Sequence, residues 1–235
     1  MIKINVLLIL PLLLCLWACG SNQLPASTVF DVRDFGAVGD SLQLNTVPIQ
    51  LAIDSCYRFG GGTVLIEGGN YLTGTILLKD NVSLKIAAGA KLSGSGDPHD
   101  YLTIDDFTDA SGQSRCNCLF GAKDAHNIGI IGAGTIDGNG TAFEWDALQV
   151  KVKALGLSET EAKGFGTNRP FLLRFVNSSR IKLEDIHLRQ AAAWACHFYQ
   201  SSGIEVTGIS IYNHAHRNND GIDLDSSHDV VIKDC

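Results

Sequence analysis

Three carboxylates lie within six residues near the end of the chain, in the run Asn-Asn-Asp-Gly-Ile-Asp-Leu-Asp at Asn218–Asp225. A carboxylate next to glycine at the start of a strand can bring an acid or a base to a substrate without backbone crowding. Side-chain alternation along that strand turns its two apolar residues inward and Asp223 and Asp225 outward, whereas Asp220 precedes it. These residues alone allow paired acid–base catalysis, calcium binding or a solvated acidic turn.

Polar residues close to this run are candidates for substrate contact. His214 and His216 enter the turn that carries Asp220, and two histidines at this spacing also allow a metal site. We expect Asn218, His216 and His197 to contact the substrate and expect no metal. The alternatives are that His197 packs with aromatic neighbours and that Asn218 stacks between coils.

The elements that must position these residues are short repeated strands. From Val29 onward, β-branched runs alternate with glycine and asparagine, and the segments 178–186, 201–209 and 226–235 align with one another. Ile181 and Ile204 lie 23 residues apart in this alignment. A repeat of this length with alternating apolar residues predicts the coils of a parallel β-helix, an all-β solenoid. Leucine-rich repeats share the length, but their regular leucine frame is absent.

Two earlier segments extend the repeat towards the start of the chain. Val82 and Ile128 head similar strands and lie 46 residues apart, which is twice the repeat length. The segment 141–168 interrupts the repeat and contains two helix-prone stretches, 147–154 and 158–163. Ser158 followed by glutamate three residues later predicts a capped helix. We interpret this segment as an insertion that walls a groove or extends into solvent.

One helix is expected before the first repeats. Asn45 can cap it, proline follows in its first turn, and it ends at the glycines 60–62. Its apolar face would cover the edge of the first coil, which otherwise exposes unpaired strand groups. The residues of that face are Ile49, Ala52, Ile53, Cys56 and Tyr57. The last strand, at 230–232, has no such cover, so the solenoid is expected to be truncated there.

Overall charge and cysteine content exclude several classes of protein. The formal charge of −7 argues against nucleic-acid binding, which requires a basic surface. The odd number of cysteines after residue 28 and their irregular spacing favour buried thiols, with one bridge as an alternative. These cysteines are Cys56, Cys116, Cys118, Cys196 and Cys235. We expect no cofactor and a monomer.

The first residues form an export signal. Lys3 precedes an apolar run that is too short to span a membrane as a helix. Leu16-Trp17-Ala18-Cys19 resembles the lipobox of bacterial lipoproteins, which predicts cleavage after residue 18 and lipidation of Cys19. The alternative is a plain secretory signal. We therefore expect a signal peptide at 1–18, a tether at 19–28 and one domain at 29–235. Because Gly20 does not favour inner-membrane retention, we expect anchoring to the outer membrane.

The carboxylate run resembles the Asn-Thr-Asp-Gly motif of glycoside hydrolase family 28, the polygalacturonases and their relatives, with Asn219 in place of threonine. The resemblance covers nearly the whole chain after the tether. Further matches follow in the family's order: Asp34–Asp40, Ala52–Cys56, Gly61–Val64, Tyr71–Gly74, Gly89–Leu92, Ile136–Gly140 with Trp145, Arg169-Pro170, and Trp194–His197.

The resemblance implies a right-handed parallel β-helix with an open cleft that hydrolyses galacturonide linkages in pectin with inversion. It implies that Asp220 activates the attacking water. The family's acid comes from an Asp-Asp pair one coil later, followed by Gly-His-Gly and Arg-x-Lys motifs. None of these follows Asp220 here, and Arg180-Ile181-Lys182 comes too early to be that motif. We therefore expect this exact chain to be inactive alone.

Two other functions remain compatible with the sequence. A β-helical polysaccharide lyase would need calcium-binding acids and a basic catalytic residue, and would leave unsaturated product ends. A non-catalytic β-helix would bind a polymer at a cell surface without cleaving it. Because fold does not determine function, the site must decide between them.

Overall fold

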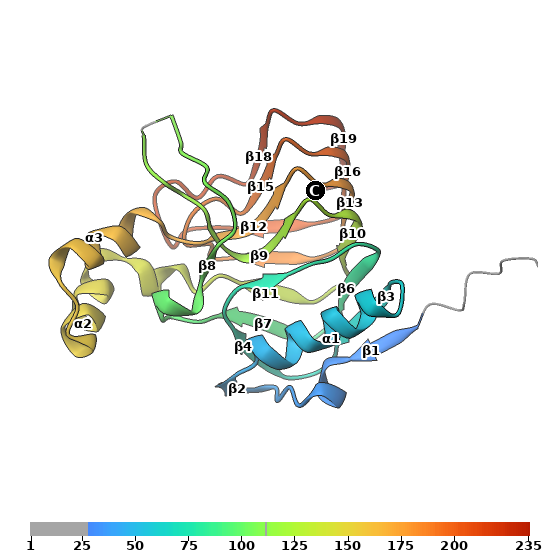
Figure 1. Ribbon diagram of the computed structural model, residues 1–235, viewed down its shortest axis with the longest axis horizontal. Helices are drawn as coiled ribbons and strands as arrows, with labels where there is room; N and C mark the ends of the chain where they lie inside the picture. Colours follow the sequence, from blue (N-terminus) through green and yellow to red (C-terminus); the bar gives the residue numbers. More distant parts are fainter. Residues whose placement is uncertain (1–27, 111) are drawn as a thin grey trace, which may run out of the picture.

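The computed structural model describes residues 28–110 and 112–235 (Figure 1). Parallel strands stack into three sheets that surround one apolar core, and each turn of the chain adds one strand to each sheet. The molecule is a right-handed parallel β-helix, as predicted. The predicted export signal, Cys19 and the predicted tether up to residue 27 lie outside the described residues.

Each sheet collects every third strand of the chain. Sheet A contains β1 (Val29–Asp31), β3 (Gly62–Ile66), β6 (Val82–Ile86), β10 (His126–Ile131), β13 (Ser179–Glu184), β16 (Ser202–Thr207) and β19 (His228–Lys233). Sheet B contains β2 (Asp40–Leu44), β4 (Asn70–Thr73), β7 (Lys91–Gly94), β11 (Thr135–Asp137), β14 (His187–Arg189) and β17 (Ser210–Tyr212). Sheet C contains β5 (Ile76–Leu77), β9 (Asn117–Lys123), β12 (Phe171–Val176), β15 (Cys196–Tyr199) and β18 (Ile222–Asp225), and β8 (Leu102–Thr103) pairs antiparallel with β9.

The strand register confirms the repeat seen in the sequence. Ile181 of β13 pairs with Ile204 of β16, and Ile204 pairs with Val230 of β19. Residues at one position of the repeat therefore stack directly along the solenoid axis. The side chains of Ile181 and Ile204 are buried in the core. In sheet C the stacked rings of Phe175 and Phe198, 5.2 Å apart and nearly parallel, repeat the same arrangement.

The interpretation of the 46-residue interval as two coils is wrong. β6 and β10 are direct neighbours, with Ser83 opposite Gly129, so a single coil spans this interval. The extra residues form a long excursion between β7 and β9, which includes the short 3-10 helix at Pro98–Asp100. A coil can lengthen in this way because the ladder fixes only the strands, and the connections between them lie on the surface.

A column of left-handed residues lies at the start of the strands of sheet A. Asn127, Arg180, Gly203 and Asp229 occupy equivalent positions in successive coils, with φ between 52° and 62°. Asn81 continues the column, and the side chain of Asn127 donates a hydrogen bond to it at 2.9 Å. Asparagine and aspartate tolerate this conformation better than most residues, which explains their recurrence at this position.

Helix α1 (Thr46–Arg58) covers the first coil, beside the 3-10 helix at Val32–Phe35. Four residues of the predicted apolar face are buried: Ile49, Ala52, Ile53 and Cys56. The fifth, Tyr57, is wrongly placed by the prediction, since its side chain is exposed beside Lys79. Asn45 is the N-cap residue, but its side chain makes no cap hydrogen bond. It instead accepts from the backbone N–H of Val38 at 2.7 Å, which ties down the preceding loop.

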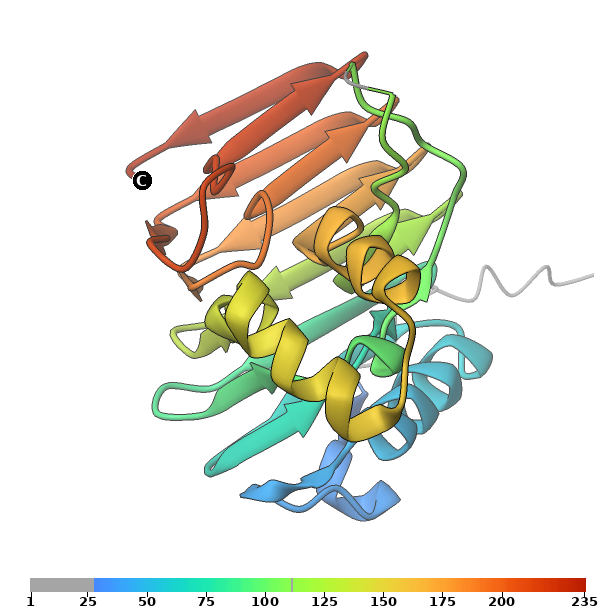
Figure 2. The same ribbon diagram turned by 90° about the vertical axis from the view of Figure 1, so that its left-hand side faces the viewer.

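The insertion forms two helices that project beside the solenoid (Figures 1 and 2). A 3-10 turn at Gly140–Phe143 leads into α2 (Trp145–Leu155), and α3 (Glu159–Thr167) follows. The predicted capping box is present: the hydroxyl of Ser158 accepts from the Glu161 N–H, and the Glu161 carboxylate accepts from the Ser158 N–H at 2.7 Å. The predicted helical insertion is therefore confirmed.

Five cysteines lie in the part of the chain that the structure describes, residues 28–110 and 112–235. Within this part all five cysteines are free, four of them buried and Cys235 exposed. The expectation of buried thiols is confirmed for those four, and the alternative of a bridge between described cysteines is not. No helix of the described part is long and apolar enough to cross a membrane.

Candidate active site

Asp220 lies on a turn, residues 213–221, that joins β17 of sheet B to β18 of sheet C. The side-chain amide of Asn219 crosses this turn and donates to the carbonyl of Asn213 at 2.5 Å. The backbone carbonyl of Asp220 accepts from the N–H of Ala195 at 2.8 Å. These bonds fix the backbone while the carboxylate of Asp220 stays exposed to solvent. An exposed carboxylate on a fixed backbone suits a base that activates water.

The strand that follows the turn places two more acids on the outer face of sheet C. In the strand register, Asp223 of β18 lies opposite His197 of β15, and Asp225 lies opposite Tyr199. Burial and the nearby charge of Asp220 raise the pKa of Asp223 to about 6. Its Oδ2 atom is buried without a hydrogen-bond partner. Asp223 can therefore hold a proton close to neutral pH.

The predicted alternation of β18 holds with one difference in burial. Ile222 packs against the core, and Leu224 pairs with Phe198, whose ring is buried inside the solenoid. Leu224 itself is 45% exposed, because the described residues contain no strand of sheet C that stacks beyond β18. Its inward direction agrees with the prediction, and its exposure reflects its place in the outermost strand.

His197 is fully buried on sheet C. Phe107, Phe171 and Trp194 surround its ring at centroid distances of 5.1–5.2 Å, and Arg174 donates a hydrogen bond to its Nδ1. Burial and the charge of Arg174 lower the pKa of His197 to about 4, so the ring is neutral. The ring therefore has no exposed surface for the expected contact with substrate. The alternative, that His197 packs with aromatic neighbours, fits the structure.

His216 and Asn218 lie on the same turn as Asp220. Nε2 of His216 donates to the carbonyl of Phe143 at 3.1 Å, which joins the turn to the insertion. Burial and the charge of Arg169 lower the pKa of His216. Asn218 is exposed with φ 62°. Both predicted substrate-binding residues therefore share one turn with Asp220. Their contact with substrate stays a prediction.

A metal site at the paired histidines has no support in the part of the chain that the structure describes. His214 packs its ring against Tyr212 at a centroid distance of 4.6 Å, whereas His216 faces the insertion. No group of three histidine, cysteine, aspartate or glutamate side chains gathers at metal-binding distances among residues 28–110 and 112–235.

A pocket of about 210 Å³ lies between the insertion and the turn that carries Asp220. Its lining combines aromatic, apolar and basic side chains and contains no carboxylate: Phe143, Trp145, Leu148, Lys163, Gly166, Thr167, Arg169, His216 and Arg217. Sequence reasoning did not find this pocket, because its residues come from segments up to 74 positions apart. Only the family matches at Trp145 and Arg169 indicated that these residues matter.

A second feature that the sequence did not predict is the loop formed by residues 104–110 and 112–116, whose Asp105 and Phe107 contact residues of sheet C. Asp105 of this loop forms an ion pair with Arg174 of β12 at 2.5 Å, and both side chains are almost fully buried. The ring of Phe107 packs between Tyr199 and His197. Asp105-Asp106 is an acidic pair upstream of the expected one, and its first carboxylate is occupied by Arg174.

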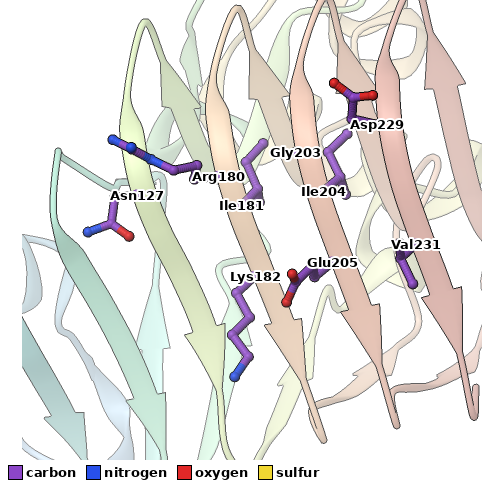
Figure 3. Close-up of a pocket in the computed structure, with 9 residues that line it drawn as sticks. All are labelled: Asn127, Arg180, Ile181, Lys182, Gly203, Ile204, Glu205, Asp229 and Val231. Carbon is purple, nitrogen blue, oxygen red and sulfur yellow. The ribbon is translucent and has the colours of Figure 1, made fainter.

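A groove over the strands of sheet A does not include Asp220. Figure 3 shows this shallow groove of about 390 Å³, which runs across the left-handed column from Asn127 to Asp229. Arg180 and Lys182 line it, but Lys182 is paired with Glu184 at 2.8 Å. The run Arg180-Ile181-Lys182 lies on sheet A, whereas Asp220 lies on the turn between sheets B and C, and the interpretation of this run as a coincidental match stays a prediction.

Comparison with known proteins supports the resemblance. The sequence profile described as glycosyl hydrolases family 28 matches residues 64–235. An exo-poly-alpha-D-galacturonosidase of Dickeya chrysanthemi is 27% identical over 87% of this chain and 39% of its own length. A polygalacturonase of Ralstonia solanacearum is 29% identical over 69% of this chain and 32% of its own length.

The solved structures show the same architecture. The family 28 exopolygalacturonase of Yersinia enterocolitica superposes with a TM-score of 0.76 at 27% identity, covering 89% of this chain and 43% of that one. The chain thus spans 32–43% of the length of these relatives. With the profile, the fold and the carboxylate turn in agreement, this chain belongs to glycosyl hydrolase family 28.

Proposed function

We propose that this chain forms the substrate-facing part of a pectin-degrading hydrolase that cleaves galacturonide linkages with inversion. The observation that carries the proposal is the fixed turn that presents the exposed Asp220 and also contributes His216 and Arg217 to the lining of a basic and aromatic pocket. A uronate polymer offers carboxylates for the basic side chains and apolar sugar faces for the aromatic ring. The names of the relatives, a galacturonosidase and polygalacturonases, support the same substrate class.

In the proposed reaction, Asp220 accepts a proton from a water molecule, and that water attacks the anomeric carbon. The glycosidic C–O bond breaks as the leaving oxygen takes a proton from a second carboxyl group. Inversion requires the two carboxyl groups to lie roughly 6.5–9.5 Å apart, so that water and sugar fit between them. We place Asn218 and His216 at the substrate, since both lie on the same turn as Asp220.

The second carboxyl group is the open part of this mechanism. The family resemblance implies an Asp-Asp pair one coil after Asp220, and residues 221–235 contain none. We therefore propose that the 235-residue chain alone does not turn over substrate. Among the described acids, Asp223 is the one whose pKa is raised, to about 6, and it is the candidate for any residual acid catalysis.

The test begins with the gene at its natural locus, read past Cys235. The proposal expects a coding sequence with an Asp-Asp pair about one coil later, and a product that releases reducing ends from polygalacturonate. Asp220→Asn in that product should lower kcat by at least about a hundredfold, because a catalytic base is lost. The matched control is Asp225→Asn, an acid on the outer face of β18, the strand that follows the turn.

Other results would change the proposal. Products with unsaturated, ultraviolet-absorbing ends would identify a lyase. Polymer binding without cleavage, unchanged by Asp220→Asn, would identify a binding protein. Strong hydrolysis by the purified 235-residue chain would show that the proposed inactivity of this chain is wrong.

We also propose that residues 1–18 direct export, that Cys19 carries a lipid and that residues up to 28 tether the domain to the outer membrane. The support is the Leu-Trp-Ala-Cys sequence that ends the apolar run. Cys19→Ala should abolish incorporation of a labelled fatty acid and release the protein from the membrane fraction. Cys15→Ala, four residues earlier, is the control and should retain the label.

A further inference from the structure

The pocket between the insertion and the 213–221 turn has an unusual charge balance. Three basic side chains line it, Lys163, Arg169 and Arg217, and no carboxylate does. Elsewhere on this molecule arginines near sheet C are neutralised: Arg174 pairs with Asp105 and Arg115 pairs with Asp109. Within the described residues, the three cations of the pocket have no such acidic partner within ion-pair distance.

Arg169 is the least satisfied of these cations. Its side chain is 93% buried, Nε donates to the carbonyl of Ala192 at 2.7 Å, and Nη1 donates to the carbonyl of Gly166 at 2.7 Å. Nη2 is buried and has no hydrogen-bond partner. Burial and the charges of Arg115 and Arg217 lower the pKa of Arg169 to about 10, as expected for a cation without a counter-charge. A buried donor without a partner is costly, so an anion here would be bound favourably.

The remaining wall suits a sugar ring. Trp145 is half exposed at the start of α2, and the buried side chains of Phe143 and Leu148 also line the pocket. The volume of about 210 Å³ is smaller than the about 300–1,000 Å³ typical of pockets for drug-sized ligands, which limits the occupant to about one sugar unit. An aromatic side chain with an apolar face and a polar edge is suited to such a ring.

From this geometry we propose that the pocket binds one uronate unit of the substrate, with its carboxylate on Arg169, Arg217 and Lys163 and its ring on Trp145. The proposal rests on the proposed function for the identity of the sugar and adds a specific subsite to it. His216 and the turn carrying Asp220 form one wall, so the subsite lies next to the candidate base in the chain. The insertion helices thereby give the enzyme its preference for an acidic unit at this position.

The test measures binding, which does not require turnover. Trigalacturonate and its neutral methyl ester are titrated against the 235-residue chain by calorimetry, with circular dichroism as the check of folding. The acid should bind more tightly than the ester. Arg217→Ala and Lys163→Ala should each weaken binding of the acid about three- to tenfold and leave the ester unchanged. Trp145→Ala should weaken binding of both ligands, because in the proposed complex the indole ring contacts the sugar face.

The controls separate this site from general electrostatics and from catalysis. Lys153→Ala, an exposed lysine of α2 outside the pocket, should bind like the wild type. Arg169→Lys keeps the charge but removes the unpartnered Nη2, and should also weaken binding of the acidic ligand. Equal binding of acid and ester, equal binding of inorganic phosphate, or no effect of Arg217→Ala would overturn the proposal. Asp220→Asn should bind normally, so loss of the hydrolase function and loss of this subsite are separate results.

Discussion

Arg174 and His197 lie opposite each other on neighbouring strands of sheet C, and Nη1 of Arg174 donates a hydrogen bond to Nδ1 of His197. Because a guanidinium only donates, Nδ1 must carry a lone pair, and the proton of the neutral imidazole lies on Nε2. That Nε2 is buried without a hydrogen-bond partner, 4.0 Å from Oδ2 of Asp225. Through Arg174 and His197, Asp105 of the 104–116 loop is thus connected to β18, the acidic strand that follows Asp220.

This arrangement predicts two opposing effects of pH on stability. The pKa of His197 is about 4 in the folded chain and 6.5 as the ordinary value, so stability is lost as pH falls from about 6.5 to 4. The pKa of Asp223 is about 6 when folded and 3.8 ordinarily, so stability is gained as pH falls from about 6 to 3.8. At pH 4.5 each effect amounts to about 2 kcal/mol, and the two nearly cancel.

Single variants should separate the two effects. Between pH 7 and 4.5, His197→Gln should gain about 2 kcal/mol relative to the wild type, and Asp223→Asn should lose about 2 kcal/mol. Urea unfolding at both pH values measures the difference for each protein. Parallel pH dependence in all three proteins would contradict the proposed protonation states.

The ion pair between Asp105 and Arg174 should hold the 104–116 loop against sheet C. Removing one partner of a buried pair leaves an uncompensated charge, so Asp105→Asn should lower the free energy of unfolding by about 3 kcal/mol. Limited proteolysis should then cut within this loop before the rest of the chain. Glu184→Gln removes the partner of Lys182 in an exposed pair and should change neither measurement. Equal effects of the two substitutions would argue against a locking role.

The left-handed column predicts which residues Gly203 can be replaced by. Gly203 has φ 62°, and a Cβ at this position meets the neighbouring Arg180 backbone only at ordinary contact distances of 3.4 Å or more. Gly203→Asn, which copies Asn127 two positions along the column, should be nearly neutral. Gly203→Val should destabilise the chain by about 1–3 kcal/mol, because a β-branched residue is strained in this conformation. Thermal unfolding of both variants checks this, and equal losses would contradict it.

Asn219 should control how firmly the turn holds Asp220. Asn219→Ala removes the hydrogen bond to the Asn213 carbonyl and should cost about 1 kcal/mol. The local readout is amide hydrogen exchange at Ala195, whose N–H donates to the Asp220 carbonyl and should exchange faster. Asn218→Gly, at the exposed neighbouring position whose φ of 62° glycine also adopts, serves as the control with unchanged exchange. Unchanged exchange in Asn219→Ala would mean that the turn is held by its backbone alone.

Local patterns were sufficient to predict the parts of this fold that repeat. The 23-residue spacing of Ile181 and Ile204 predicts their register, because stacked coils place equivalent residues directly over one another. The capping box at Ser158 and the alternation along β18 are equally local, since each depends on residues within one turn of helix or one strand. Asp220 was identified by its neighbours in the chain, through the resemblance of that run to a known motif.

Tertiary structure decided what happens between the repeats. The 46 residues from Val82 to Ile128 form one coil, because a solenoid constrains its strands and leaves loop lengths free. The same freedom brings Asp105 onto Arg174, 69 positions later, and the insertion onto the turn beside Asp220. Such contacts depend on how the loops pack against the strands, and the repeat pattern of the sequence does not predict them. The sugar-sized basic pocket therefore emerges only once α2, α3 and the turn lie together in space.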